Sequence, residues 1–261
     1  MDTLIICHIP KTAGRTLQHL LVSSYSSDKV LLNAHRLLAD ASKGDLDQYQ
    51  LIMGHIGFGV HQKLASREFK YLSFMRDPIK RVISLYEYTK LKPDQELHEL
   101  AKKMSLAEFI ESRVTKETYN DQTTLISGIR VTDDSVGEQA LNAAIFNIDN
   151  YFPVVGITER FAESWFVIRQ KLDLPYKFYF ARNVNKNKEI HKLSSREEEV
   201  IREANKFDIQ LYDYANKSLS KEIDSQSLVS TLKMNSEIIF NKPYSLIQEN
   251  LRKLKKSLSK K

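Results

Sequence analysis

The chain has 261 residues, of which 42% are hydrophobic and 28% are charged, a balance typical of a folded domain rather than of a disordered chain. Its formal net charge of +6 and its pI of about 9.1 favour anionic partners such as nucleotides, sulfated glycans, nucleic acid or a membrane surface. No run approaches the roughly 20 apolar residues of a membrane span, nothing resembles a signal peptide and Cys7 is the only cysteine, so we expect a cytoplasmic protein with no transmembrane segment and no internal disulfide.

The first predicted elements are a strand at residues 3–9, a tight loop at residues 10–16 and a helix whose apolar residues recur at 3.6-residue spacing up to Tyr25. The first N–H groups of such a helix have no partner within the helix, and the peptide dipoles add positive potential there. Lys11 contributes a full positive charge to the loop. The stretch therefore predicts a binding site for a phosphate or sulfate group.

The rest of the chain alternates between predicted strands and helices. In chain order we first expect a polar helix at 35–49, strands at 51–53 and 71–75, and a helix that starts after Asp77. Helices at 105–114 and 135–147 follow, with a loop-bounded segment at 120–128 between them, and then a strand at 152–157 and a further helix. Asp77 fits an N-cap with Pro78 at the first helical position, and Thr158 is expected to cap the last of these helices. Strands separated by helices predict an α/β fold with a parallel sheet and right-handed crossovers.

The final part of the chain is helical in propensity and rich in lysine. We expect one α/β domain at residues 1–216 and a helical, basic C-terminal extension at residues 217–261. In the extension, leucines at 251, 254 and 258 recur at three- to four-residue spacing with a basic opposite face. A helix packed on the domain, a contact between copies in a homo-oligomer and a helix at a membrane surface are the three interpretations of this pattern.

Two motifs resemble those of a known enzyme family. Ile9-Pro10-Lys11-Thr12-Ala13-Gly14-Arg15-Thr16 resembles the 5'-phosphosulfate loop of sulfotransferases that use 3'-phosphoadenosine 5'-phosphosulfate (PAPS). Arg76-Asp77-Pro78-Ile79-Lys80-Arg81-Val82-Ile83-Ser84 is similar to that family's 3'-phosphate motif, an arginine before Asp-Pro with a serine eight residues later. The resemblance spans residues 5–188 and is strongest to the carbohydrate branch related to heparan sulfate 2-O- and 6-O-sulfotransferases (sulfotransferase family 2). It implies a P-loop-like parallel sheet flanked by helices.

The resemblance also implies a role for particular residues. Lys11 would hold the phosphosulfate and neutralise charge on the bridging oxygen, while Arg76 and Ser84 would hold the 3'-phosphate. His55, in Gly54-His55-Ile56, is similar to the histidine base of the heparan 2-O-sulfotransferase-like branch. The residues implied to bind the cofactor are Lys11, Thr12, Ala13, Gly14, Arg15, Thr16, Arg76, Ser84 and Arg182.

The implied reaction moves a sulfuryl group in line from PAPS to a hydroxyl acceptor and leaves adenosine 3',5'-bisphosphate (PAP) as product. The resemblance favours a glycan as acceptor, with other small metabolites open, and it implies no nucleic-acid partner. Arg15 departs from the small or hydroxyl residue common at its position, and the loop at 182–187 resembles the basic loop that closes over the nucleotide. The carboxylates are scattered and the histidines lack a zinc-like spacing, so we expect no metal site.

Other interpretations of the same residues stay open. An ATP-dependent kinase on a similar core is one, although Lys11 precedes the only glycine of the loop and the Gly-Lys-Ser/Thr end of a Walker A loop is missing. A non-catalytic protein that binds nucleotide or polyanion through the basic tail is another. His61 is an alternative base, Arg76 could pair with a surface carboxylate, and the loop around Lys11 could be an ordinary turn.

Overall fold

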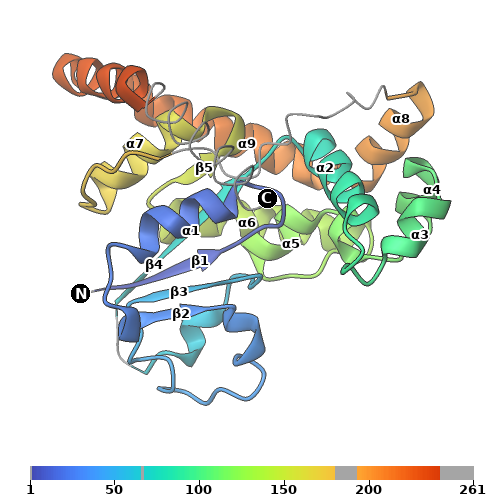
Figure 1. Cartoon of the computed structure of the whole chain (residues 1–261), viewed down its shortest axis with the longest axis horizontal. Coiled ribbons are helices and arrows are strands. Elements are labelled where there is room, and N and C mark those ends of the chain that lie inside the picture. Colours follow the sequence, from blue (N-terminus) through green and yellow to red (C-terminus); the bar gives the residue numbers. More distant parts are fainter. Residues whose placement is uncertain (1, 66–67, 180–192, 242–261) are drawn as a thin grey trace, which may run out of the picture.

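The sheet lies at the centre of the molecule. The computed structural model describes residues 2–65, 68–179 and 193–241, and in that part five parallel strands form one sheet in the order β2-β3-β1-β4-β5 (Figure 1). The strands are β1 (Thr3–Cys7), β2 (Val30–Leu32), β3 (Leu51–Gly54), β4 (Phe69–Met75) and β5 (Val155–Ile157). The expected α/β class with a parallel sheet is confirmed.

The central strand β1 is buried along its whole length. Ile5 pairs with Ile52 of β3 on one side and with Tyr71 of β4 on the other. Strands that are covered on both faces read as continuous apolar runs, and this is how β1 and β3 appear in the sequence.

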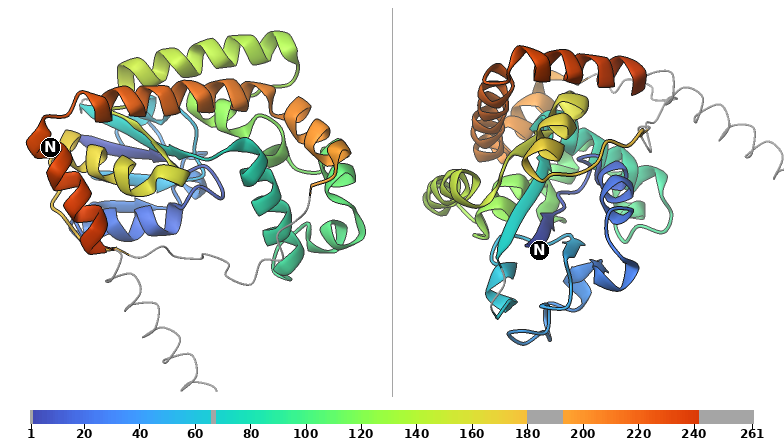
Figure 2. Two further views of the ribbon diagram at one scale, coloured as in Figure 1. Left: turned by 90° about the horizontal axis from the view of Figure 1, so that it is seen from above. Right: turned by 90° about the vertical axis from the view of Figure 1, so that its left-hand side faces the viewer.

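Helices cover both faces of the sheet. The α-helices that the structure describes, on these faces and beyond the strand ends, are α1 (Gly14–Val22), α2 (Pro78–Leu91), α3 (His98–Lys103), α4 (Leu106–Glu111), α5 (Asp121–Ser127), α6 (Asp134–Tyr151), α7 (Phe161–Lys171), α8 (Ser195–Ala204) and α9 (Lys206–Asp224). Figure 2 shows α1 and α7 on one face and α6 and α9 on the other. The main hydrophobic core lies between these layers and the sheet.

A second hydrophobic cluster joins α2, α3, α4 and α8 beyond the carboxyl ends of the strands (Figure 1). Val82 and Tyr86 of α2 are buried in it, as their helical spacing predicts. The start of α2 is also confirmed, because Pro78 is its first residue and the carboxylate of Asp77 accepts a hydrogen bond from the Lys80 amide at 2.9 Å.

Two predicted elements differ in the structure. The helix expected at 35–49 is a short 3-10 helix, Ala34–Arg36, followed by turns. There Gly44 has a φ of 96°, and Asp45 accepts from the Ser42 amide, a local bond that competes with helix. Residues 121–127 form helix α5 rather than a loop-bounded segment.

The predicted cap at Thr158 is wrong. Its hydroxyl donates to the Met75 carbonyl at 2.9 Å and so joins the end of β5 to the end of β4. A 3-10 turn, Thr158–Arg160, follows β5, and α7 begins only at Phe161.

Helix α9 runs without a break across residues 216 and 217, where the C-terminal extension was expected to begin. Leu219, in the second half of α9, is fully buried in the main core. Residues 228–241 are helical, and residues 242–261, with the leucine repeat, lie outside the described residues. None of the described helices has the length and apolar character that crossing a membrane requires.

Candidate active site

The loop between β1 and α1 is held in an unusual backbone conformation. Lys11 and Ala13 both have left-handed φ values, 71° and 63°. Left-handed residues that alternate with ordinary ones turn successive backbone N–H groups toward one concavity, which suits an anion. Thr12 fixes this shape, because its buried hydroxyl donates to the Ile9 carbonyl at 2.8 Å.

The other predicted loop residues differ in their surroundings. Thr16 is buried, and its amide donates to the Ala13 carbonyl at 2.9 Å within the first turn of α1. Arg15 is exposed. Gly14 lies so close to His8 that a Cβ atom there would stand 1.7 Å from His8 Nε2. The φ of Gly14 is not positive, so the close approach of the imidazole, and not the backbone, is what requires a glycine.

Lys11 connects the loop to the neighbouring elements. Its ammonium lies over the ring of Tyr88, 3.8 Å from the ring centroid. Tyr88 follows half-buried Ser84 by four residues on α2, so both lie on one face of that helix. The Lys11 carbonyl accepts a hydrogen bond from Arg76 Nη1 at 3.1 Å. The structure thus brings together the residues that the two motifs singled out.

Arg76 follows the last residue of β4 and is half-buried. The side-chain amide of Gln122 binds its backbone twice: Arg76 N–H donates to Oε1 at 3.0 Å, and Nε2 donates to the Arg76 carbonyl at 2.9 Å. Glu159 lies 3.8 Å from Arg76 Nε and accepts from the Asp77 amide at 3.4 Å. Burial lowers the pKa of Arg76 from its ordinary value, and the charges of Glu159 and Asp77 oppose that shift.

His55 follows the last residue of β3, at the same sheet edge as the loop and Arg76. Its Nδ1 lies 3.1 Å from the His8 carbonyl oxygen. Because a carbonyl can only accept, Nδ1 carries the hydrogen, and in the neutral ring the lone pair is on Nε2. The rings of His55 and His8 stack with centroids 4.7 Å apart. Burial, followed by the charge of His55, lowers the pKa of His8 to about 4, so His8 is neutral near pH 7.

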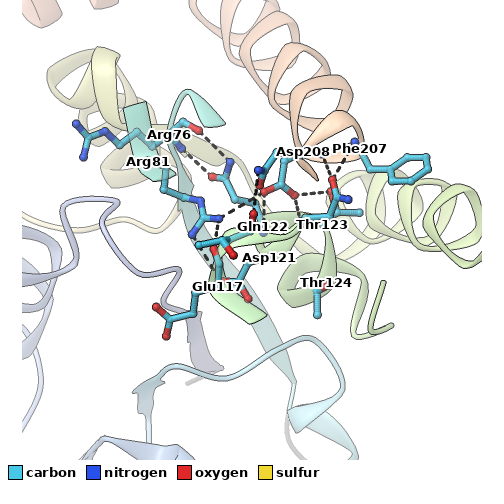
Figure 3. A network of polar contacts seen from close by, with 12 residues as sticks. Arg76, Arg81, Glu117, Asp121, Gln122, Thr123, Thr124, Phe207 and Asp208 are labelled. Atoms are coloured by element: carbon cyan, nitrogen blue, oxygen red, sulfur yellow. Dashed lines mark hydrogen bonds and ion pairs between the residues drawn. The ribbon is translucent and has the colours of Figure 1, made fainter. Parts of the chain in front are cut away.

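A buried polar network lies beside this edge (Figure 3). Arg81 of α2 is fully buried and forms ion pairs with Asp121 at 3.7 Å and with Asp208 at 3.8 Å, and its Nη2 donates to the Glu117 carbonyl at 2.6 Å. Burial raises the pKa of Asp121 to about 7 and also raises that of Asp208. This cluster and the contact of Glu159 with Arg76 could not be predicted from the sequence, since the residues become neighbours only in the folded chain.

One predicted residue lies elsewhere, and another falls outside the described residues. His61 packs against Phe69 and Tyr151, and its Nδ1 lies 3.0 Å from the Tyr71 hydroxyl, near the amino end of β4 and away from His55. Arg182, with the loop at 182–187, is outside the described residues. Within 2–65, 68–179 and 193–241, no group of three or more His, Cys, Asp or Glu side chains could hold a metal ion.

The match to a family model agrees with the motifs. Residues 1–215 match the family model described as the sulfotransferase family. A protein-tyrosine sulfotransferase of Arabidopsis thaliana is 29% identical over 90 residues, which are 34% of this chain and 17% of the plant protein's length. The crystal structure of mouse sulfotransferase SULT7A1 complexed with PAP aligns with a TM-score of 0.37 and 13% identity, over 97% of this chain and 88% of that chain.

Proposed function

This chain belongs to the sulfotransferase family, and we propose that it transfers the sulfuryl group of PAPS to a hydroxyl group of an acceptor. The observation that carries the proposal is that Lys11, His55 and Arg76 follow three adjacent strands, β1, β3 and β4, of one parallel sheet. Ligands of open α/β sheets bind outside the carboxyl ends of the strands. One ligand at this edge can therefore meet all three side chains.

We place the nucleotide between the β1 loop and α2. The left-handed residues Lys11 and Ala13 support a phosphosulfate site, because they turn backbone N–H groups toward the same space. Arg76 offers a guanidinium to the 3'-phosphate, and Ser84 offers a hydroxyl from the face of α2 that also carries Tyr88. A contact from Arg182 stays a prediction.

We assign the base to His55. The acceptor hydroxyl gives its proton to the Nε2 lone pair as its oxygen attacks sulfur. The bond from sulfur to the bridging phosphate oxygen breaks, and both electrons stay on PAP. Lys11 stabilises the charge that gathers on that bridging oxygen. The bond from His55 Nδ1 to the His8 carbonyl supports this assignment, since it orients the ring and stabilises the imidazolium that forms.

Calorimetric titration with PAP, beside a titration with ATP and Mg²⁺, tests the cofactor. We expect metal-independent PAP binding that weakens strongly in Arg76→Ala, while Arg196→Ala, an exposed arginine of α8, binds as the wild type does. Binding of ATP with metal alone would contradict the proposal and favour the kinase. Binding that depends instead on the lysines after residue 250 would favour the non-catalytic polyanion binder.

Turnover assays test the catalytic roles. His55→Ala should bind PAP normally and lose roughly 10²- to 10⁴-fold in turnover, the usual contribution of a positioned base. Lys11→Ala should lose both phosphosulfate binding and turnover. His19→Ala removes an exposed imidazole from the last turn of α1 and should be silent. Full turnover of His55→Ala on the true acceptor would refute the base assignment.

For the acceptor we propose a glycan, on the resemblance of the motifs to carbohydrate sulfotransferases. The plant relative is named a protein-tyrosine sulfotransferase, so a tyrosine phenol is the competing hydroxyl. Parallel assays with labelled PAPS on desulfated glycosaminoglycans and on acidic tyrosine peptides decide between them. The cytoplasmic location and the homo-oligomer stay predictions.

A further inference from the structure

Arg76 needs support that the sheet does not supply. The pairing between β4 and β5 ends at Met75 and Ile157, so Arg76 is the first residue beyond the ladder. A residue in this position usually turns with its loop. Here, however, both its N–H and its carbonyl are bound by one side chain, that of Gln122, at 3.0 and 2.9 Å.

The carboxamide of Gln122 takes the place of a neighbouring strand. It combines a donor and an acceptor in one plane, so a single side chain can satisfy the N–H and the C=O of one residue. Gln122 is fully buried and lies 46 residues away in sequence. The contact therefore depends on tertiary structure and not on the local chain.

Gln122 is itself held by the buried network (Figure 3). The backbone N–H of Gln122 donates to Asp208 Oδ2 at 3.2 Å. The backbone N–H and the hydroxyl of Thr123 donate to Asp208 Oδ1 at 2.7 and 2.8 Å. From the other side, the Asn120 carboxamide oxygen accepts from the Phe207 and Asp208 amides at 3.0 and 3.2 Å. The first turns of α5 and α9 are therefore joined by hydrogen bonds in both directions, and each fixes the position of the other.

The same network returns to the helix that follows Arg76. Arg81, five residues later in α2, places its buried guanidinium between Asp121 and Asp208. Two contacts thus fix the position of Arg76: Gln122 binds its backbone directly, and the ion pairs of Arg81 hold the start of α2, the helix that follows it. With the backbone held, its Nη1 reaches the Lys11 carbonyl at 3.1 Å.

We propose that Gln122 is a positioning residue for Arg76 and sets the preference of the site for nucleotides with a 3'-phosphate. The inference rests on the proposed function, because it takes Arg76 to be the group that binds that phosphate. The side chain of Gln122 acts only through the backbone of Arg76. Its loss therefore weakens the 3'-phosphate contact and leaves the 5' end of the nucleotide unaffected.

The test compares two nucleotides that differ by the 3'-phosphate, PAP and adenosine 5'-monophosphate. The measured quantity is the ratio of their dissociation constants in the full-length protein. Gln122→Met keeps the length of the side chain and removes both hydrogen bonds, and we expect it to reduce the preference for PAP by roughly tenfold. Gln122→Leu also removes both hydrogen bonds, with a branched apolar side chain, so its preference should fall in the same way.

Ser127→Ala is the matched control. It removes the hydrogen bonds between the Ser127 hydroxyl and the backbone of Ile129 at the other end of α5, outside the network that holds Gln122, so it should lower the melting temperature and leave the ratio unchanged. In Arg76→Ala the preference should fall to the part that Ser84 supplies, and adding Gln122→Met to that variant should cost nothing more, since both changes act on one contact.

A folded Gln122→Met protein with the wild-type ratio would overturn the inference while leaving the proposed function intact. If Gln122→Met does not fold, a wild-type ratio in Gln122→Leu has the same meaning. An unchanged ratio in Arg76→Ala would instead show that Arg76 does not bind the 3'-phosphate, and the proposed nucleotide site would fail together with the inference.

Discussion

The substitution Gly14→Ala should displace the stacked pair of His8 and His55 and leave nucleotide binding unchanged. The backbone at Gly14 accepts alanine, because its φ is not in the left-handed region. The new Cβ, however, would stand 1.7 Å from His8 Nε2, whereas ordinary contact begins at 3.4 Å. The imidazole of His8 must therefore retreat by about 1.7 Å, the difference between these two distances.

That retreat disturbs the face against which His55 stacks. A displacement of about 1 Å in a catalytic group can cost 10²-fold in rate, so we expect turnover of Gly14→Ala to fall by about that factor. PAP binding should change little, because the backbone N–H groups of the loop are retained. Steady-state rates with PAPS and calorimetry with PAP measure the two effects separately.

A double-mutant cycle identifies the cause. In a His8→Ala background the ring is absent, so Gly14→Ala should cost almost nothing further. If Gly14→Ala lowers turnover by the same factor in both backgrounds, the clash with His8 is not the cause and the reasoning from that contact is refuted. Normal turnover of Gly14→Ala would refute the role of the stacked ring.

Three further predictions follow from the described contacts. Burial lowers the pKa of His8 from 6.5 to about 4, so between these pH values the unfolded chain takes up a proton that the folded chain does not. The free energy of unfolding, measured by urea titration, should therefore fall by up to about 3 kcal/mol between pH 6.5 and pH 4. Arg81→Met leaves Asp121 and Asp208 buried without a counter-charge and should lower the free energy of unfolding by about 3–5 kcal/mol at pH 8, as measured by the same titration. The loss should be smaller at pH 5, where the Asp121 carboxyl, whose pKa is raised to about 7, takes up a proton. Tyr88→Leu removes the ring beneath the Lys11 ammonium, an interaction of about 0.5–2 kcal/mol, and should lower kcat/KM for PAPS, whereas Tyr88→Phe should not.

Each of these has an outcome that contradicts it. His8→Asn should flatten the stability profile below pH 6.5, and an unchanged slope in that variant would assign the proton uptake to other groups. Equal destabilisation of Arg81→Met at pH 5 and pH 8 would show that the Asp121 carboxyl does not take up a proton between these two pH values. Equal losses in Tyr88→Leu and Tyr88→Phe would mean that the hydroxyl, and not the ring face, supports Lys11.

The sequence was sufficient for the elements whose signals are local. The apolar strands β1 and β3 were predicted, as was the start of α2 at Asp77 and Pro78. Strand β2 was missed because three residues at the edge of a sheet carry no periodic pattern. Helix α5 was missed because a left-handed Asn120 and a carboxylate 85 residues away, Asp208, hold its first turn.

The candidate site was predictable to the same extent. Lys11, His55 and Arg76 could be assigned to one edge because the carboxyl ends of parallel strands share an edge. The stacking of His8 on His55 depends on the register of two strands, and the Gln122 contact depends on a crossover of 46 residues. Neither can be read from spacing along the chain.

The hydrogen bond between Arg76 Nη1 and the Lys11 carbonyl joins the two ends of the proposed nucleotide site. The distance between those ends is therefore set by the protein before any ligand binds, and the site selects ligands by the spacing of their phosphate groups. Adenosine 2',5'-bisphosphate carries the same charge as PAP but holds its second phosphate in a different place. A site of fixed span distinguishes such regioisomers by shape, where attraction to a positively charged surface would treat them alike.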